Sequence, residues 1–214
     1  MEGLMMNEAK RARTSHSIHE LIATRWSPYG FDARPVSESD LRSLFEAARW
    51  AASSYNEQPW RFIVARKKDA AEFERMLACL VEGNQAWARR APVLALAVAR
   101  LHFSHNDKPN PAAQHDIGMA TCSLQLQATA LGLSVHPMIG ILPQRAREEY
   151  TIPQGYEALT ALALGYAAEL DALDDTLRRR DEAVRLRKPL SELVFARTWK
   201  RTAAWVEDPT GESS

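Results

Sequence analysis

Hydrophobic positions along the chain recur with two different periods, and both periods are found throughout the sequence. Apolar residues spaced three and four apart are typical of amphipathic helices, which we expect over residues 40–52, 69–81 and 114–131, with a short last helix over 191–199. Compact apolar runs predict strands over residues 60–65, 93–99, 135–141 and 159–165. Because helices and strands are intermixed, the pattern predicts an α+β fold with one core.

The most regular helical pattern covers residues 114–131. Gly132 follows its last apolar residue, in the position of a C-terminal cap. Leu126 and Ala130 extend the apolar surface beyond one face, so we expect this helix to be covered on two sides, either in the core or at a subunit contact. Cys122, on the same helix, is expected to be a small core residue.

The composition limits the kinds of partner that the chain can have. Its 214 residues include 27 basic and 27 acidic side chains, so no net charge attracts nucleic acid or an acidic membrane. The length predicts a single domain over residues 17–206, between a flexible N-terminus (1–16) and a flexible tail (207–214). The first residues lack the apolar core of a secretion signal, and the two cysteines form no disulfide framework, so we expect a cytoplasmic protein.

The motifs of several enzyme classes are missing from the sequence. None of the nine glycines lies in a GxG pair, which argues against a Rossmann nucleotide domain and a P-loop. There is no GxSxG nucleophile motif. His102 and His105, with His115 further on, lack the partners that would complete a zinc site, so we expect no metal.

Three polar segments carry residues that can bind a ligand. Arg25 and Ser27 combine a positive charge with a hydroxyl group. Arg185 and Arg187 alternate just before a proline, so in an extended segment both side chains project to one side, which suits a phosphate monoester. Residues 52–60 offer hydroxyl and amide groups that suit the polar edges of a planar heterocycle. Each segment alone also fits an ordinary turn, in which Ser and Asn cap backbone groups.

Together, these segments resemble the nitroreductase family of FMN enzymes, over about residues 17–200. The most specific part is Ser53-Ser54-Tyr55-Asn56-Glu57-Gln58-Pro59-Trp60. The other matching elements are Arg25-Trp26-Ser27, Gly83-Asn84 with Trp87, Pro137-Met138-Ile139-Gly140, Leu164-Gly165-Tyr166 and Arg185-Leu186-Arg187-Lys188-Pro189.

The resemblance implies a nitroreductase-like α+β fold, with a central, mostly antiparallel sheet flanked by helices, and an obligate homodimer with FMN at its interface. It implies an enzyme that uses NADH or NADPH to reduce nitroaromatics, quinones or similar small acceptors by ping-pong hydride transfer. The flavin carries this chemistry, so no catalytic side chain is expected. The FMN-binding residues that it implies are Arg25, Trp26, Ser27, Tyr29, Ser53, Ser54, Asn56, Asn84, Met138, Ile139, Gly140, Arg185 and Arg187.

The same resemblance implies a role for each group of residues. The arginines, with Ser27, would hold the phosphate and ribityl chain, and Ser53, Ser54 and Asn56 would reach the flavin from the partner subunit. Asn84 would bond the polar edge of the ring, and the backbone of residues 138–140 would lie against flavin N5 and O4. Gln58 is expected to fix its own loop. Relatives commonly carry Arg or Lys where this chain has Tyr29.

Two alternatives remain open at this level. One is a narrower FMN enzyme of the same fold, such as a dehalogenase, an enone reductase or a flavin-consuming enzyme, which the loop at about residues 101–113 would distinguish. The other is a dimer that binds or senses FMN without catalysis.

Overall fold

The computed structural model describes residues 10–206. The flexible ends expected at residues 1–16 and 207–214 therefore lie outside the described residues, apart from 10–16. The chain divides into two compact units, of which the first ends at Ala183 and the second begins at Val184.

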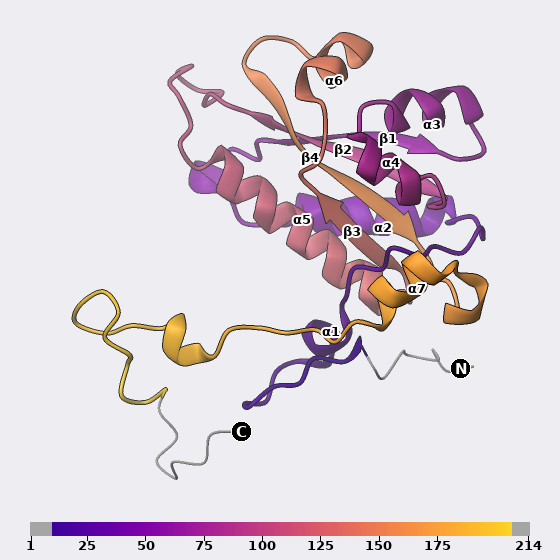
Figure 1. Cartoon of the computed structure of the whole chain (residues 1–214). Helices are drawn as coiled ribbons and strands as arrows, with labels where there is room; N and C mark the ends of the chain where they lie inside the picture. The colour runs from indigo at the N-terminus through magenta and orange to yellow at the C-terminus, as the bar shows by residue number, and fades with distance from the viewer. Residues whose placement is uncertain (1–9, 207–214) are drawn as a thin grey trace. The chain divides into compact units, whose positions relative to one another are not determined.

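An antiparallel sheet forms the centre of the first unit (Figure 1). Its strands lie in the order β1 (Trp60–Arg66), β2 (Val93–Arg100), β4 (Tyr156–Gly165) and β3 (Ser134–Met138), and every neighbouring pair is antiparallel. All residues of β2 except Arg100 are buried, as its continuous apolar run predicts. The expected α+β architecture with an antiparallel sheet is confirmed.

Helices cover both faces of this sheet. Side chains of β2 alternate between two apolar clusters: Leu94 and Leu96 point to one, and Ala95 and Ala97 to the other. The first cluster includes residues of α3 (Ala70–Leu77), α4 (Glu82–Ala88), α6 (Pro143–Tyr150) and α7 (Asp175–Glu182). The second includes residues of α2 (Glu38–Arg49) and α5 (Ala113–Ala130), while a short α1 (Glu20–Thr24) lies near α5.

Several predicted boundaries need correction. The helix expected over residues 69–81 ends at Leu77, and α4 is a separate helix after a turn. The strand expected over 135–141 ends at Met138, where pairing with β4 stops. The helix expected over 191–199 is wrong: only a 3₁₀ turn forms at Leu190–Glu192, because the chain then reverses and Ala196 N donates to Arg201 O.

One side of α5 packs inside the first unit and the other does not. Its buried stripe includes Ile117, Ala120 and Leu124, and Gly132 caps the end with a φ of +72°. On the opposite side, Met119 is 42% exposed and Cys122 is exposed too, so the expectation of a core cysteine was wrong. The helix is therefore covered on one side by its own chain. A subunit contact that would cover the other side stays a prediction.

Candidate functional site

The first candidate segment follows directly after α1. Arg25 is the C-cap of that helix, and its Nη1 donates to Ser27 Oγ (3.2 Å) and to Gln125 Oε1 of α5 (3.3 Å). Trp26 lies between them and, like both, is half-buried. The structure thus brings the cation and the hydroxyl together, in the arrangement expected of an anion site.

Residues 28–30 are fixed from several sides. Ala168 N donates to Gly30 O (3.1 Å), which pairs this segment with the chain that leaves β4. His136 Nδ1 contacts Pro28 O at 2.8 Å. Burial lowers the pKa of His136, so the neutral ring is favoured, and its Nδ1–H donates to the Pro28 carbonyl. The backbone after Arg25 and Ser27 is therefore held firmly.

Tyr29 is enclosed by other rings and by a cation. Its ring centroid lies 5.2 Å from that of Trp87 and 4.7 Å from that of His136, with both pairs in edge geometry. The guanidinium of Arg180 lies 4.9 Å from the same centroid. A positive charge is thus present beside Tyr29.

The loop over residues 53–58 has a strained backbone. Tyr55, Asn56 and Gln58 have φ values of +53°, +53° and +51°, in the left-handed region that costs about 1–2 kcal/mol for each residue with a side chain. Ser53 Oγ accepts from Gln58 N (3.0 Å), and Gln58 Nε2 donates to Asn56 O (3.0 Å), so Gln58 fastens the loop as expected. Strain that is kept in place in this way is typical of functional loops.

Two buried carboxylates tie this loop to its surroundings. Asp116 of α5 accepts from Ser54 N at 3.0 Å. Glu57 accepts from Ser104 N (2.8 Å) and Ser104 Oγ (3.1 Å), which connects the loop to residues 101–112. The ring of Tyr55, which is 85% exposed, meets the ring of Phe103 edge-on at 5.7 Å. The loop thus presents an aromatic surface together with its hydroxyl and amide groups.

Asn84 and Gly140 form a third group. Asn84 Nδ2 and Val81 N both donate to Gly140 O, at 3.0 and 3.1 Å, and Trp87 Nε1 donates to Asn84 Oδ1 at 3.3 Å. A Cβ atom at Gly140 would lie only 2.4 Å from Asn84 Nδ2, so a side chain here would displace the Asn84 amide. Within residues 10–206 the Gly140 N–H donates to no backbone carbonyl.

The two residues before Gly140 differ in the burial of their side chains. The side chain of Met138 is buried, whereas Ile139 is 88% exposed. The buried Met138 side chain therefore cannot meet a ligand, and the role that the resemblance implies for the backbone of residues 138–140 stays a prediction.

Arg185 and Arg187 belong to the second unit. Arg185 is half-buried, and Arg187 is exposed, with its Nη1 donating to Leu186 O at 2.7 Å. Their role in holding a phosphate stays a prediction.

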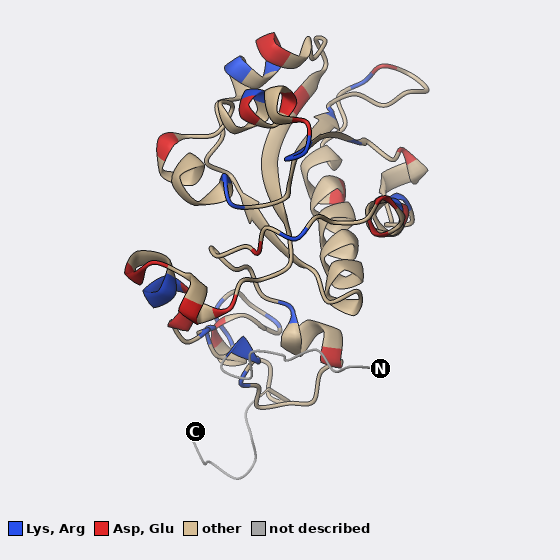
Figure 2. Cartoon of the chain, turned by 90° about the vertical axis from the view of Figure 1, so that its right-hand side faces the viewer, with Lys and Arg blue, Asp and Glu red and all other residues tan. Residues whose placement is uncertain are grey.

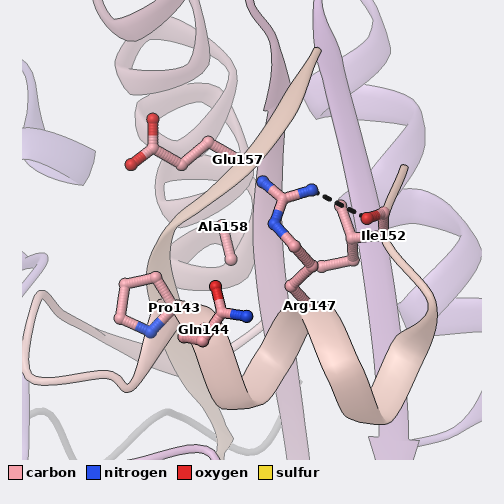
Figure 3. A pocket seen from close by; sticks show the side chains of 6 residues that line it. All are labelled: Pro143, Gln144, Arg147, Ile152, Glu157 and Ala158. Atoms are coloured by element: carbon pink, nitrogen blue, oxygen red, sulfur yellow. Dashed lines mark hydrogen bonds between the residues drawn. The ribbon is translucent and has the colours of Figure 1, made fainter. Parts of the chain in front are cut away.

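A small hollow lies apart from the predicted residues (Figure 3). It measures about 140 Å³ and is lined by Pro143, Gln144, Arg147, Ile152, Glu157 and Ala158. The Arg147 guanidinium donates to the carbonyl oxygens of Ile152 and Pro153 (2.8 Å each) and of Tyr156 (2.6 Å). Because its charge already serves three carbonyls, this arginine ties together the chain between α6 and β4.

Charge and metal-ligating groups give no second candidate. Basic and acidic residues are interspersed along the chain (Figure 2), in keeping with the balanced composition. Over the described range, no group of three or more His, Cys, Asp or Glu residues is arranged to hold a metal ion. None of the helices in that range is long and apolar enough to cross a membrane.

Sequence comparison gives the site its context. The model of the nitroreductase family matches residues 22–166. The chain belongs to the nitroreductase family. A relative from Streptomyces coelicolor named "Putative NADH dehydrogenase/NAD(P)H nitroreductase" is 30% identical over 166 residues, which cover 68% of this chain and 81% of the relative. One of the same name from Archaeoglobus fulgidus is 28% identical over 152 residues, 69% of this chain and 83% of that protein.

Solved structures of the nitroreductase fold resemble the chain closely. A crystal structure described as an oxidoreductase containing FMN superposes with a TM-score of 0.84 and 35% identity, over 92% of this chain and all (100%) of the other. A nitroreductase family protein from Clostridium difficile gives a TM-score of 0.65 and 26% identity, over 86% of this chain and 99% of the other.

Some residues that shape the candidate site escape prediction from the sequence. Asp116 lies four residues before Ala120, and Asp181 four residues after Leu177, so both carboxylates fall on buried helix faces. That position is the signal that could have revealed them, because a buried charge needs hydrogen-bond partners. The partners themselves come from distant parts of the chain.

Proposed function

We propose that this member of the nitroreductase family is a cytoplasmic, homodimeric FMN oxidoreductase that takes electrons from NADH or NADPH and reduces nitroaromatics, quinones or similar small acceptors. The similarity to an oxidoreductase containing FMN, at 35% identity over 92% of the chain, supports the cofactor. The names of the relatives from Streptomyces and Archaeoglobus support the electron donor.

The observation that carries the proposal is the pairing of Arg25 with Ser27 in a fixed segment. A phosphate monoester such as that of FMN carries a charge of about −1.5 to −2 near neutral pH. A guanidinium and a hydroxyl 3.2 Å apart, both half-buried, can bind such a group by charge-assisted hydrogen bonds. Arg185 and Arg187 would add further positive charge.

The remaining residues fit the polar edges of a flavin. Asn84 and Val81 hold the Gly140 carbonyl, and the Gly140 N–H, in the preceding peptide unit, would donate to the flavin. Asn84 would therefore act on the flavin by fixing the backbone at Gly140. Ser53, Ser54 and Asn56 lie in a loop whose shape is held by internal hydrogen bonds, so its donors and acceptors are organised before a ligand arrives.

FMN supplies the hydride chemistry when it is bound. The chain's own residues bind the phosphate, orient the ring and present a hydrogen-bond donor to it. The rings of Tyr55 and Phe103 offer apolar surface to a planar acceptor.

The purified protein tests this proposal directly. We expect a yellow protein that binds one FMN per chain, loses its colour with NADH or NADPH in the absence of oxygen, and regains it when a quinone or nitroaromatic is added. A colourless protein that does not bind added FMN would refute the proposal. A yellow protein that neither nicotinamide reduces would be a binding or sensing protein instead.

A further inference from the structure

A single buried carboxylate on α7 binds the backbone that follows the predicted phosphate site. Asp181 is only 1% exposed. Its Oδ1 accepts from Tyr29 N (2.9 Å), and its Oδ2 accepts from Gly30 N (2.8 Å). Both oxygens of one side chain are thus used on two consecutive amides, more than 150 residues away in the sequence.

An ionised carboxylate suits this position better than a neutral one. Two N–H groups point at it, and a protonated acid would turn a third donor toward them. Burial raises the pKa of Asp181 overall, while the two amide hydrogen bonds and the positive charge of Lys10 lower it in part. A buried charge with such specific partners is costly to keep for packing alone, since an apolar side chain of similar size often packs as well.

The same part of the chain contacts residues 29 and 30 in two further ways. A Cβ atom at Gly30 would lie 2.5 Å from Leu173 Cδ2, so Leu173 packs directly against this glycine. Arg180 places its guanidinium 4.9 Å from the centre of the Tyr29 ring. Residues 173–181 therefore bind the backbone of residues 29 and 30, pack against Gly30 and contact the ring of Tyr29.

We propose that Asp181 is a positioning residue for FMN. By fixing the amides of Tyr29 and Gly30, it sets the path of the chain that carries Arg25 and Ser27, and so the direction in which their guanidinium and hydroxyl meet a phosphate. It also fixes Tyr29 itself. This inference rests on the proposed function.

Three variants of the full chain test it. Asp181→Asn keeps the size of the side chain but turns an N–H donor toward one backbone amide, and Asp181→Ala removes both acceptors. Glu182→Gln is the control, because it makes the same change of charge at the next residue of α7, which is exposed. The FMN-free form of each protein is titrated with FMN, and binding is followed by the loss of flavin fluorescence.

We expect Asp181→Asn to bind FMN about 10- to 100-fold more weakly than the parent, as the loss of a charge-assisted hydrogen bond predicts. Glu182→Gln should match the parent. At saturating FMN, the visible circular dichroism of the bound flavin should also change in Asp181→Asn and not in the control. That signal reports the surroundings of the ring, which a loss of overall stability alone would leave unchanged.

A second measurement separates positioning from folding. If Asp181 acts through Arg25, the effects of Asp181→Asn and Arg25→Ala on FMN binding will be less than additive in the double variant. An Asp181→Asn protein with parental affinity and parental visible circular dichroism would overturn this inference and leave the proposed function intact. Additive effects would overturn it as well. A parent protein that does not bind FMN would refute the proposed function, and this inference with it.

Discussion

Buried carboxylates accept hydrogen bonds from backbone amides at several places around the candidate site. Asp116 accepts from Ser54 N, Glu57 from Ser104 N, and Asp181 from two amides. Each carboxylate comes from a different part of the chain and holds a segment that regular secondary structure does not. A charged acceptor forms stronger hydrogen bonds than a neutral one, so a few such groups can define a loop.

Tyr29 leads to a prediction about the potential of the bound flavin. Reduction adds negative charge to the ring, and a unit charge 4 Å away contributes roughly 4 kcal/mol at an effective dielectric constant near 20, before desolvation. We expect Tyr29→Arg to raise the two-electron potential by about 20–40 mV, which corresponds to about 1–2 kcal/mol. An anaerobic titration against a reference dye measures this, with Tyr29→Phe as the control.

An unchanged or lower potential in Tyr29→Arg would contradict this prediction. It would show that the charge at this place is already provided, and Arg180, 4.9 Å from the Tyr29 ring centre, is the group to test next.

Arg187 leads to a prediction about affinity rather than potential. It alternates with Arg185 in the segment that resembles the family's phosphate-binding arginines. One charge-assisted hydrogen bond contributes about 1.5–3 kcal/mol to binding. Arg187→Ala loses such a bond, so it should bind FMN roughly 10- to 100-fold more weakly. Arg201→Ala, which removes another exposed arginine of the second unit, is the control. Retention of FMN through dialysis as in the parent would show that Arg187 does not hold the phosphate.

His136 leads to a prediction about pH. Its pKa is lowered by burial, so the folded protein favours the neutral ring, and the unfolded chain binds the proton more readily. Stability from this group is complete above the ordinary histidine pKa of about 6.5 and falls as the pH drops below it. We expect the free energy of unfolding, measured with urea, to fall less between pH 7.5 and pH 5.5 in His136→Asn than in the parent. The amide of the new side chain can still donate to Pro28 O.

His16→Asn is the control for that measurement, because His16 is exposed. An equal loss of stability in the parent and in His136→Asn would mean that other groups cause the pH dependence.

At the scale of elements, the sequence is informative wherever one local pattern decides the outcome. Ser37, a residue type typical of helix N-caps, caps α2: its Oγ accepts from Asp40 N at 3.0 Å. The strands at residues 60 and 93 begin as predicted, because their apolar runs are continuous. The helix expected over 191–199 fails for the opposite reason, since the pairing of Phe195 with Thr202 decides that segment.

The same distinction applies to the candidate site. Residues 53–58 could be recognised because motif, turn chemistry and ligand chemistry coincide in one short stretch. The two partners of Asp181 could not, because tertiary packing determines them. Residues that can contact a ligand are thus easier to predict from the sequence than residues that hold those residues in place.

The cap at Ser37 gives a prediction at this scale. Ser37→Ala removes the acceptor for Asp40 N and should lower the free energy of unfolding by about 1 kcal/mol, within a range of roughly 0.5–2 kcal/mol. Ser39→Ala, two residues further on and exposed inside α2, should be neutral or slightly stabilising, because alanine is the better helix former. Equal unfolding midpoints in urea for the parent and Ser37→Ala would show that the cap contributes nothing.

At the scale of the whole molecule, the exposed side of α5 bears on assembly. Its buried stripe packs within the chain, yet Met119 on the other side remains 42% exposed. An apolar helix surface that its own chain leaves open is typical of a subunit contact. If Ser53, Ser54 and Asn56 reach the flavin of the partner subunit, as the family resemblance implies, a monomer would lack part of each site.

We therefore expect a dimer whose dissociation releases FMN. Met119→Lys places a charge in the expected contact and should shift dissociation to protein concentrations at least about tenfold higher, because an unpaired charge is costly to bury. Gln144→Lys, on an exposed position of α6, adds the same charge elsewhere and should dissociate as the parent does. Light scattering over a dilution series gives the oligomeric state, and flavin fluorescence in the same samples gives the released cofactor. Both signals should change at the same concentration, because the site is complete only in the dimer; a monomer that retains FMN would show that one chain is sufficient to bind it.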